Sequence, residues 1–228
     1  MTWLSLLAAA VAPGLALLSY FYLKDRYETE PIHMVLRLFL FGVLLVFPIM
    51  MVQRALVLAF GENPYVFSFV YSGGIEELFK WLILYLVIYK HLAFDEPYDG
   101  IVYAVAVSLG FATMENVFYV FLNYSSFLDL MVRALMPVSG HALFGVAMGY
   151  YMGSAKFHPA RKNIFLLASI ATPILYHGVF DLILIKAETY WLYWMLPLML
   201  FLWGRSLWKV QHANDRSPLR GLMLDERA

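Results

Sequence analysis

Cysteine is absent from the 228-residue sequence, which excludes disulfide bonds and thiolate-ligated metal sites. Charge is scarce: charged residues make up 14% of the chain, against about a quarter in soluble proteins. The formal net charge is zero, so nothing indicates a nucleic-acid partner. The sequence also lacks internal repeats, low-complexity segments and an HExxH zinc motif. These absences exclude an ordinary soluble domain.

Long apolar runs take the place of the missing charge, and apolar side chains supply 62% of the chain. Each run approaches the ~20 residues that a ~30 Å hydrocarbon core requires. We therefore expect an all-α, polytopic bundle of about seven transmembrane helices in the plasma membrane. Residues 1–210 would form one integral-membrane domain, and residues 211–228 a polar, disordered cytoplasmic tail. The runs cover roughly residues 2–23, 38–52, 66–90, 99–123, 130–153, 164–186 and 190–208.

Lysine and arginine are distributed unequally between the connections of such a bundle. With seven spans, one side of the membrane receives twelve of them and the other side three, which are Arg54, Arg133 and Lys186. Cytoplasmic connections carry the excess of positive charge. The sequence therefore predicts an external N-terminus and a cytoplasmic C-terminus.

A few polar side chains interrupt the apolar runs. At the centre of a membrane, each charge costs about 2.5–3.5 kcal/mol, so such groups must pair, hold protons, bind a cation or line a wet cavity. The residues concerned are Glu76, Glu77 and Lys80 in the third run, Glu115 and Asn116 in the fourth, His141 in the fifth, and His177 and Asp181 in the sixth.

Helical spacing indicates which of these groups meet. Lys80 lies four residues after Glu76 and three after Glu77, so the three share one helix face. His177 and Asp181 are also four residues apart. His141 continues into a stripe of glycines at every fourth position, which allows a neighbouring helix to approach closely. The stripe contains Gly145, Gly149 and Gly153.

The direction of each helix sets the depth of its polar groups. Because successive spans run in opposite directions and rise about 1.5 Å per residue, the polar positions of four helices fall in one layer. With the predicted orientation, that layer lies in the outer half of the membrane. Pro137 and Pro173 each precede a histidine by four residues, so each histidine is expected just after a helix kink.

Three chemistries suit such a layer. A carboxylate beside Lys80 can act as general base on water, while a histidine stabilises an oxyanion or protonates a leaving amine. Glutamate and histidine also bind zinc, whose bound water is a nucleophile at neutral pH. Buried acids and histidines also form the relays of proton- or cation-coupled transporters. The residues alone leave these alternatives open, and a purely structural alternative is that the glutamates only balance Lys80.

Four polar motifs, taken in order, resemble the PrsW family of bacterial intramembrane proteases. They are EELFK, DGIVYAVAVSLGFATMEN, RALMPVSGHALFGVAMGYYMG and HGVFD. The resemblance covers nearly the whole chain before the tail. It implies a membrane peptidase that makes the first, outer-side cut in a single-pass, membrane-anchored anti-sigma factor. That cut would start the release of an extracytoplasmic-function sigma factor and so serve a stress response.

The same resemblance extends distantly to the CAAX prenyl endopeptidases and implies residue roles. In those relatives, the first glutamate of a pair activates water without a catalytic metal. Carried over, Glu76 is the base, His177 an oxyanion or acid group, and Asp181 orients His177 or holds a proton. The expected catalytic set is Glu76, Glu77, Glu115, His141, His177 and Asp181, with Lys80 and Asn116 in support.

The implied mechanism favours no cofactor, and zinc is the alternative. In that case the expected ligands are Glu76, Glu115, His141, His177 and Asp181. Asp99, which precedes the fourth run, is expected to be the N-cap of its helix.

Overall fold

The computed structural model describes residues 3–122 and 126–220. Within these residues every regular element is helical and no strand occurs, which confirms the expected all-α class. The α-helices are α1 (Trp3–Tyr22), α2 (Ile32–Phe60), α3 (Pro64–Val66), α4 (Gly73–Val87), α5 (Asp99–Leu122), α6 (Phe127–Arg133), α7 (Ser139–Phe157), α8 (Lys162–Lys186) and α9 (Trp191–Asp215). Two π-helical segments and two 3₁₀ turns connect some of them: η1 (Phe67–Ser72), η2 (Ala134–Val138), η3 (Pro159–Arg161) and η4 (Glu188–Tyr190).

The described elements join into seven long helical rods, because η1 links α3 to α4 and η2 links α6 to α7 without a break. Five of the rods are long and apolar enough to cross a membrane: α1, α2, α5, the α6–α7 rod and α8. The rod that ends with α4 contains three charged side chains. Neither this rod nor α9 meets the length and hydropathy limits for a membrane span. The chain is thus a multi-pass helical protein, and seven crossings remain a prediction.

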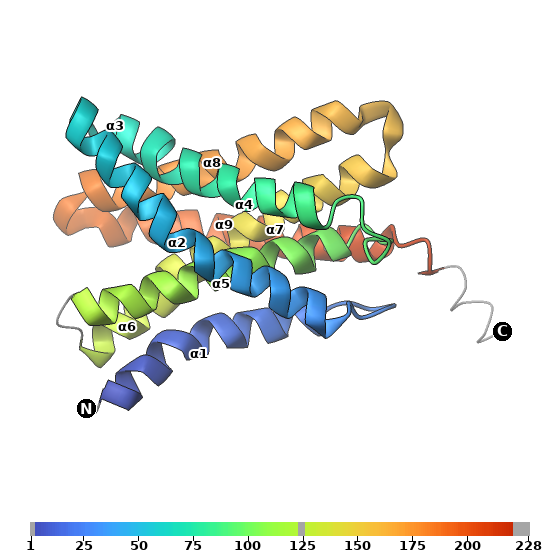
Figure 1. Ribbon diagram of the computed structural model, residues 1–228, viewed down its shortest axis with the longest axis horizontal. Helices are drawn as coiled ribbons and strands as arrows, with labels where there is room; N and C mark the ends of the chain where they lie inside the picture. Colours follow the sequence, from blue (N-terminus) through green and yellow to red (C-terminus); the bar gives the residue numbers. More distant parts are fainter. Residues whose placement is uncertain (1–2, 123–125, 221–228) are drawn as a thin grey trace.

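The rods lie side by side in one bundle (Figure 1). The start of α1 and the end of α9 lie at opposite ends of this bundle. An odd number of antiparallel rods produces this arrangement. Large apolar side chains such as Leu44, Leu167 and Leu200 are exposed on the outer faces of α2, α8 and α9, where a bilayer would cover them.

Helix α5 forms the centre of the bundle and packs against α1, α2 and α7. All its residues from Asp99 to Thr113 are buried, as expected for a helix that is apolar around its whole circumference. The contact with α7 depends on small residues: a Cβ atom on Gly145 would lie 2.8 Å from Ser108 Oγ, and one on Gly100 would lie 2.5 Å from the Gly149 carbonyl oxygen. The glycine stripe of α7 therefore serves the close approach that its spacing predicts.

Helix α9 continues to Asp215, past residue 210, where the sequence predicts the boundary between the membrane domain and the tail; that division stays a prediction. Its last turns are fixed by the connection between α1 and α2. Arg26 Nη2 donates to Gln211 Oε1 at 2.7 Å, and Asn214 Nδ2 donates to the Lys24 carbonyl oxygen at 3.3 Å. Asn214 is buried. Residues 221–228 lie outside the described residues.

Candidate active site

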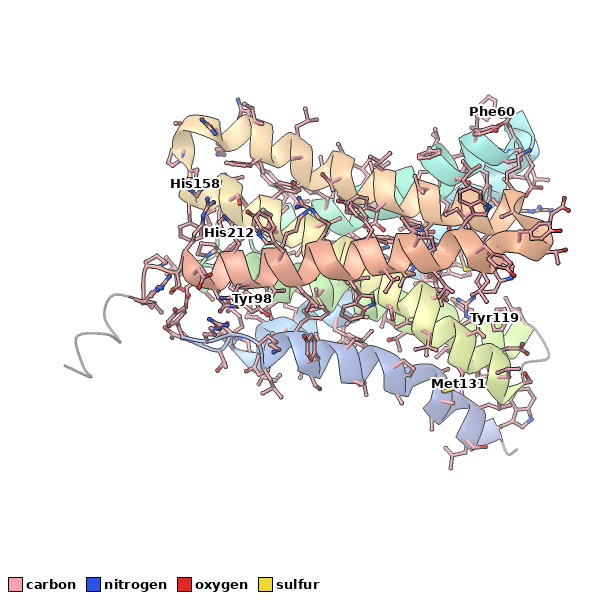
Figure 2. The ribbon with its side chains drawn as sticks, turned by 180° about the vertical axis from the view of Figure 1, so that it is seen from behind. Phe60, Tyr98, Tyr119, Met131, His158 and His212 are labelled. Atoms are coloured by element: carbon pink, nitrogen blue, oxygen red, sulfur yellow. The ribbon has the colours of Figure 1, made fainter. Side chains whose placement is uncertain are left out.

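Side chains from four helices meet in one buried cluster. It contains the polar residues expected from the sequence except one: Glu76, Glu77 and Lys80 of α4, Glu115 of α5, His141 of α7, and His177 and Asp181 of α8. The cluster lies toward the end of the bundle at which Phe60 and Tyr119 are labelled in Figure 2. Glu115 is one helical turn before Tyr119 on α5.

Lys80 occupies the middle of this cluster and is fully buried. Its Nζ atom donates to Glu77 Oε1 at 2.8 Å and to His141 Nδ1 at 3.1 Å, and it lies 3.5 Å from Glu76 Oε2. The ammonium group also lies over the ring of Phe111, 4.2 Å from its centre. One positive charge therefore offsets two buried carboxylates, which explains how the membrane helix accommodates them.

His177 is held by Glu77 from the neighbouring helix. Its Nδ1 atom lies 2.9 Å from Glu77 Oε1, and because a carboxylate accepts, Nδ1 carries the hydrogen of this bond. Nε2 then faces two other carboxylates, Asp181 Oδ2 at 3.5 Å and Glu76 Oε2 at 3.9 Å. The ring also stacks on Phe144, with 5.0 Å between ring centres. These contacts fix the ring so that Nε2 points at the open side of Glu76.

His141 connects Lys80 to Glu115. Because an ammonium group can only donate, His141 Nδ1 accepts from Lys80, and the ring proton of neutral His141 is on Nε2. Nε2 donates to Glu115 Oε2 at 2.9 Å. A continuous chain of hydrogen bonds therefore runs from Glu115 through His141, Lys80 and Glu77 to His177.

Glu76 has one engaged oxygen and one free oxygen. Oε1 accepts from Gln53 Nε2 at 3.0 Å and from Ser72 Oγ at 3.3 Å. Oε2 is buried and has no hydrogen-bond partner among the described residues, although Lys80 lies 3.5 Å away. A carboxylate oriented through one oxygen, with the other left open, is suited to accept a proton from a bound water.

Helices α4 and α8 approach closely enough for these contacts because both carry glycine at their interface. A Cβ atom on Gly73 would lie 3.1 Å from the Gly178 nitrogen and 3.3 Å from His177 Cβ. A Cβ atom on Gly178 would run into the ring of Phe69. These two glycines set the separation across which Glu77 and His177 meet.

Two π-helical segments precede site residues. The first, η1, ends at Ser72, one turn before Glu76. The second, η2, contains Pro137 and ends three residues before His141, which agrees with the distortion expected there. Pro173, by contrast, lies inside the uninterrupted α8. Single π turns inside α-helices are frequent at functional sites because they re-aim the following side chains.

A cavity of about 130 Å³ opens beside the cluster, between α5, the α6–α7 rod and α8. Glu115 and Asp181 are the most exposed members of the cluster, with 28% and 18% of their side-chain surface accessible, and both line this cavity. Apolar side chains, one histidine and one arginine complete the lining. They are Pro137, Phe144, Phe180, Leu184, His141 and Arg133. Water can reach the polar groups from here.

One expected supporting residue does not join the cluster. Asn116 turns toward α1 and α6, where its Nδ2 atom donates to the Ala10 carbonyl oxygen and its Oδ1 atom accepts from Arg133 Nε at 2.7 Å. Sequence reasoning missed Gln53 and Ser72, which orient Glu76. The only signal for Gln53 was a lone amide at the end of an apolar run, beside Arg54.

Some of the cluster's donor atoms fit a metal ion. One oxygen or nitrogen from each of Glu76, Glu77, His141 and His177 lies within 4.8 Å of all the others, and all four residues are buried. Glutamate oxygen and imidazole nitrogen are common zinc ligands, and one oxygen of each glutamate has no hydrogen-bond partner. This group differs from the ligand set expected from the sequence: it contains Glu77, and it does not contain Glu115 or Asp181. Lys80 competes for the same site, since its ammonium group contacts three of the four residues.

Comparisons with known proteins agree with this chemistry. Residues 30–203 match the family described as PrsW family intramembrane metalloprotease. The chain is 51% identical over 211 residues to the Protease PrsW of Geobacillus kaustophilus (strain HTA426), covering 92% of each protein. It is 50% identical over 213 residues to the Protease PrsW of Bacillus subtilis (strain 168), covering 92% of this chain and 96% of the relative. No solved structure matches the chain.

Proposed function

The chain belongs to the PrsW family of intramembrane proteases and is a multi-pass membrane peptidase. From this premise we propose that it makes the first, extracytoplasmic-side cut in a membrane-anchored anti-sigma factor. The cut would start the proteolysis that releases an extracytoplasmic-function sigma factor. The observation that carries the catalytic part is the buried convergence of Glu76, Glu77 and His177. The transporter alternative has no support from the curated relatives, which are named as proteases.

The depth of the cluster supports cleavage within one half of the membrane. Glu115 lies seven residues before the end of α5 and His177 nine residues before the end of α8, or about 10 Å and about 14 Å along their axes. Both of these helix ends lie at the end of the bundle where α1 begins. With the N-terminus outside, as the distribution of lysine and arginine predicts, that end is the extracytoplasmic one.

We assign the role of general base to Glu76. A water between Glu76 Oε2 and the scissile carbonyl carbon would lose a proton to Oε2 as it attacks. The same carboxyl group would then return that proton to the leaving nitrogen. His177, when protonated, has a hydrogen on Nε2 to donate to the oxyanion, while Glu77 holds its Nδ1 side. Asp181, 3.5 Å from Nε2, fixes the orientation of this edge of the ring.

A metal-dependent form of the same hydrolysis is the alternative, and Glu76, Glu77, His141 and His177 would hold the ion. A metal ion bound there would polarise the peptide carbonyl and acidify water. Lys80 would have to lose its proton or withdraw for these donors to be free. We favour the metal-free form because the ammonium group already provides the counter-charge that the carboxylates need.

Co-expression with a tethered substrate tests the proposal. A single-pass anti-sigma factor should be cut in the presence of the wild-type protein and remain intact with Glu76→Gln, and sequencing of the fragment ends should place the cut on the extracytoplasmic side. Glu62→Gln, which changes an exposed glutamate outside the cluster, is the matched control and should cut normally. An uncut substrate, or a cut on the cytoplasmic side, would contradict the proposal.

A further inference from the structure

A second group of carboxylates lies at the other end of the bundle, the end at which Tyr98 and His158 are labelled in Figure 2. It comes from two connections, residues 23–31 between α1 and α2 and residues 88–98 between α4 and α5, and from the first residue of α5. We call this group the connection cluster. Its members are Asp25, Glu30, Asp95, Glu96 and Asp99.

Asp99 organises the second connection, but not as the N-cap that we expected. Its Oδ2 atom accepts from the backbone N–H groups of Asp95 at 2.8 Å and Glu96 at 2.6 Å, which precede the helix. The connection therefore folds around the Asp99 carboxylate. One carboxylate oxygen from each of these three residues lies within 4.8 Å of the other two.

Glu96 is the least satisfied member of the connection cluster. Only 1% of its surface is exposed, and both carboxylate oxygens are buried without a hydrogen-bond partner of normal geometry among the described residues. The Ser217 hydroxyl and the Glu28 backbone are near enough to lower the pKa of Glu96, but burial raises it more. A buried carboxylate without a counter-charge is costly, so the arrangement needs a compensating cation or a proton.

Within the described residues no ion pair supplies that counter-charge, although the charge of Lys156 acts at longer range on Asp99, Asp95 and Glu30. In the part of the chain that the structure describes, no carboxylate of the connection cluster lies within ion-pair distance of a lysine, arginine or histidine. The nearby Lys156 donates to the His91 carbonyl oxygen at 3.0 Å and lies over the Phe94 ring.

Glu30 adds a carboxylate from the first connection. It is buried, and its Oε2 atom accepts a hydrogen bond from the Tyr103 hydroxyl. Burial, together with the negative charge of Asp99, raises the pKa of Glu30 to about 10. A cavity of about 130 Å³ between the two connections is lined by Glu28, Glu30 and Asp95, so water can reach one edge of the connection cluster.

We propose that the connection cluster binds a hard divalent cation, Ca²⁺ or Mg²⁺, through the carboxylates of Glu30, Asp95, Glu96 and Asp99. The donors are all oxygen atoms, the set that these two ions prefer, whereas zinc favours nitrogen and sulfur. The ion would tie residues 23–31 to residues 88–98. Because residues 88–98 join α4, which carries Glu76 and Glu77, to α5, which carries Glu115, the ion would fix the relative position of two helices that build the candidate active site.

Calorimetric titration tests the site on the full-length protein, purified in detergent and stripped with EDTA. We expect wild-type protein to bind one Ca²⁺ or Mg²⁺ per chain and its thermal unfolding midpoint to rise with saturation. Glu96→Gln, which keeps the side-chain shape, should weaken binding by about tenfold or more and lose the midpoint shift. Running the two ions as separate titrations identifies the preferred one.

Three controls make the outcome decisive. Asp95→Asn, at an exposed position, should weaken binding even if Glu96→Gln folds poorly. Glu62→Gln should leave binding unchanged. Glu76→Gln, which should change the unfolding midpoint little, should also leave binding unchanged, which separates this site from the candidate active site. Absence of saturable binding by the wild-type protein, full binding by both Glu96→Gln and Asp95→Asn, or loss of binding in Glu76→Gln would each overturn the proposal.

Discussion

Nδ1 of His177 lies 2.9 Å from Oε1 of Glu77, across the interface between α8 and α4. The same carboxylate oxygen accepts from Lys80 Nζ at 2.8 Å, so Glu77 joins the histidine to the buried ammonium group. Among the described residues, each of the two glutamates keeps one buried oxygen without a hydrogen-bond partner, but their other oxygens differ. Oε1 of Glu76 accepts from the neutral groups of Gln53 and Ser72, whereas Oε1 of Glu77 is bonded to Lys80 and His177.

Glu76→Gln should reduce cleavage of a tethered substrate by about 10²–10⁴-fold, the usual contribution of a general base. Glutamine keeps the shape of the side chain and can still bond to Gln53 and Ser72, so the thermal unfolding midpoint should change little. Cleavage is measured on membranes with the fragment resolved by electrophoresis, with Glu62→Gln as control. Normal cleavage by Glu76→Gln would remove Glu76 from the mechanism.

Glu77→Leu should destabilise the protein, by about 3–5 kcal/mol, because it leaves the Lys80 ammonium buried with one weaker partner. Adding Lys80→Met should recover much of that stability, since both charges are then gone. Cleavage should stay low in both variants because His177 has lost its Nδ1 partner. Denaturant unfolding in detergent measures the free energy of unfolding of each variant. If the effects of Glu77→Leu and Lys80→Met simply add in the double variant, the result would contradict the buried ion pair.

Gly178→Ala should push α8 away from η1, which continues into α4, since the added Cβ atom would run into the Phe69 ring. The expected result is loss of cleavage with a lowered unfolding midpoint. Gly204→Ala on α9 is the matched control: a Cβ atom there meets nothing within 4 Å, and alanine favours the helix. If Gly178→Ala cleaves as well as Gly204→Ala, the close approach of the two helices is not required.

Gln53→Met should slow cleavage by roughly 10–100-fold, because it removes a hydrogen bond to the Glu76 carboxylate that is worth about 1.5–3 kcal/mol. We expect kcat to fall and KM to stay unchanged, because Gln53 contacts the base and does not line the cavity beside the cluster. A change confined to KM would mean that Gln53 contacts the substrate instead.

Removal of metal separates the two catalytic types. We expect cleavage by purified protein to survive complete chelation of transition metals, verified by elemental analysis, because Lys80 already balances the carboxylates. Loss of cleavage on chelation with a strong zinc chelator, and its return with about one equivalent of zinc, would instead support the metal form. The measurement needs Ca²⁺ or Mg²⁺ kept constant, so that the connection cluster does not confound it.

Within a single helix, the sequence was enough to predict which polar side chains share a face. The spacing of Glu76, Glu77 and Lys80, and of His177 and Asp181, predicted shared faces correctly, because the period of an α-helix is the same in every context. Opposite helix directions then placed all these groups in one layer. The family followed from the same motifs and their order.

The sequence was not enough to predict which side chains of different helices contact each other. The rotation of each helix about its axis depends on packing, and here glycine contacts and two π-helical turns set it. That is why Gln53 of α2 was missed and Asn116, adjacent to Glu115, turned out to face α1 and α6. The connection cluster was missed for the same reason, since its carboxylates are brought together by two connections far apart in the chain.

The sequence by itself determined the all-helical membrane class, the family and the residues able to do chemistry, because hydropathy and helical period are local properties. Only the tertiary structure decided which of two neighbouring glutamates bonds to Lys80 and His177, which amide orients the other and where Lys80 places its charge. Those depend on distances between atoms of different helices, which the order of residues does not encode locally.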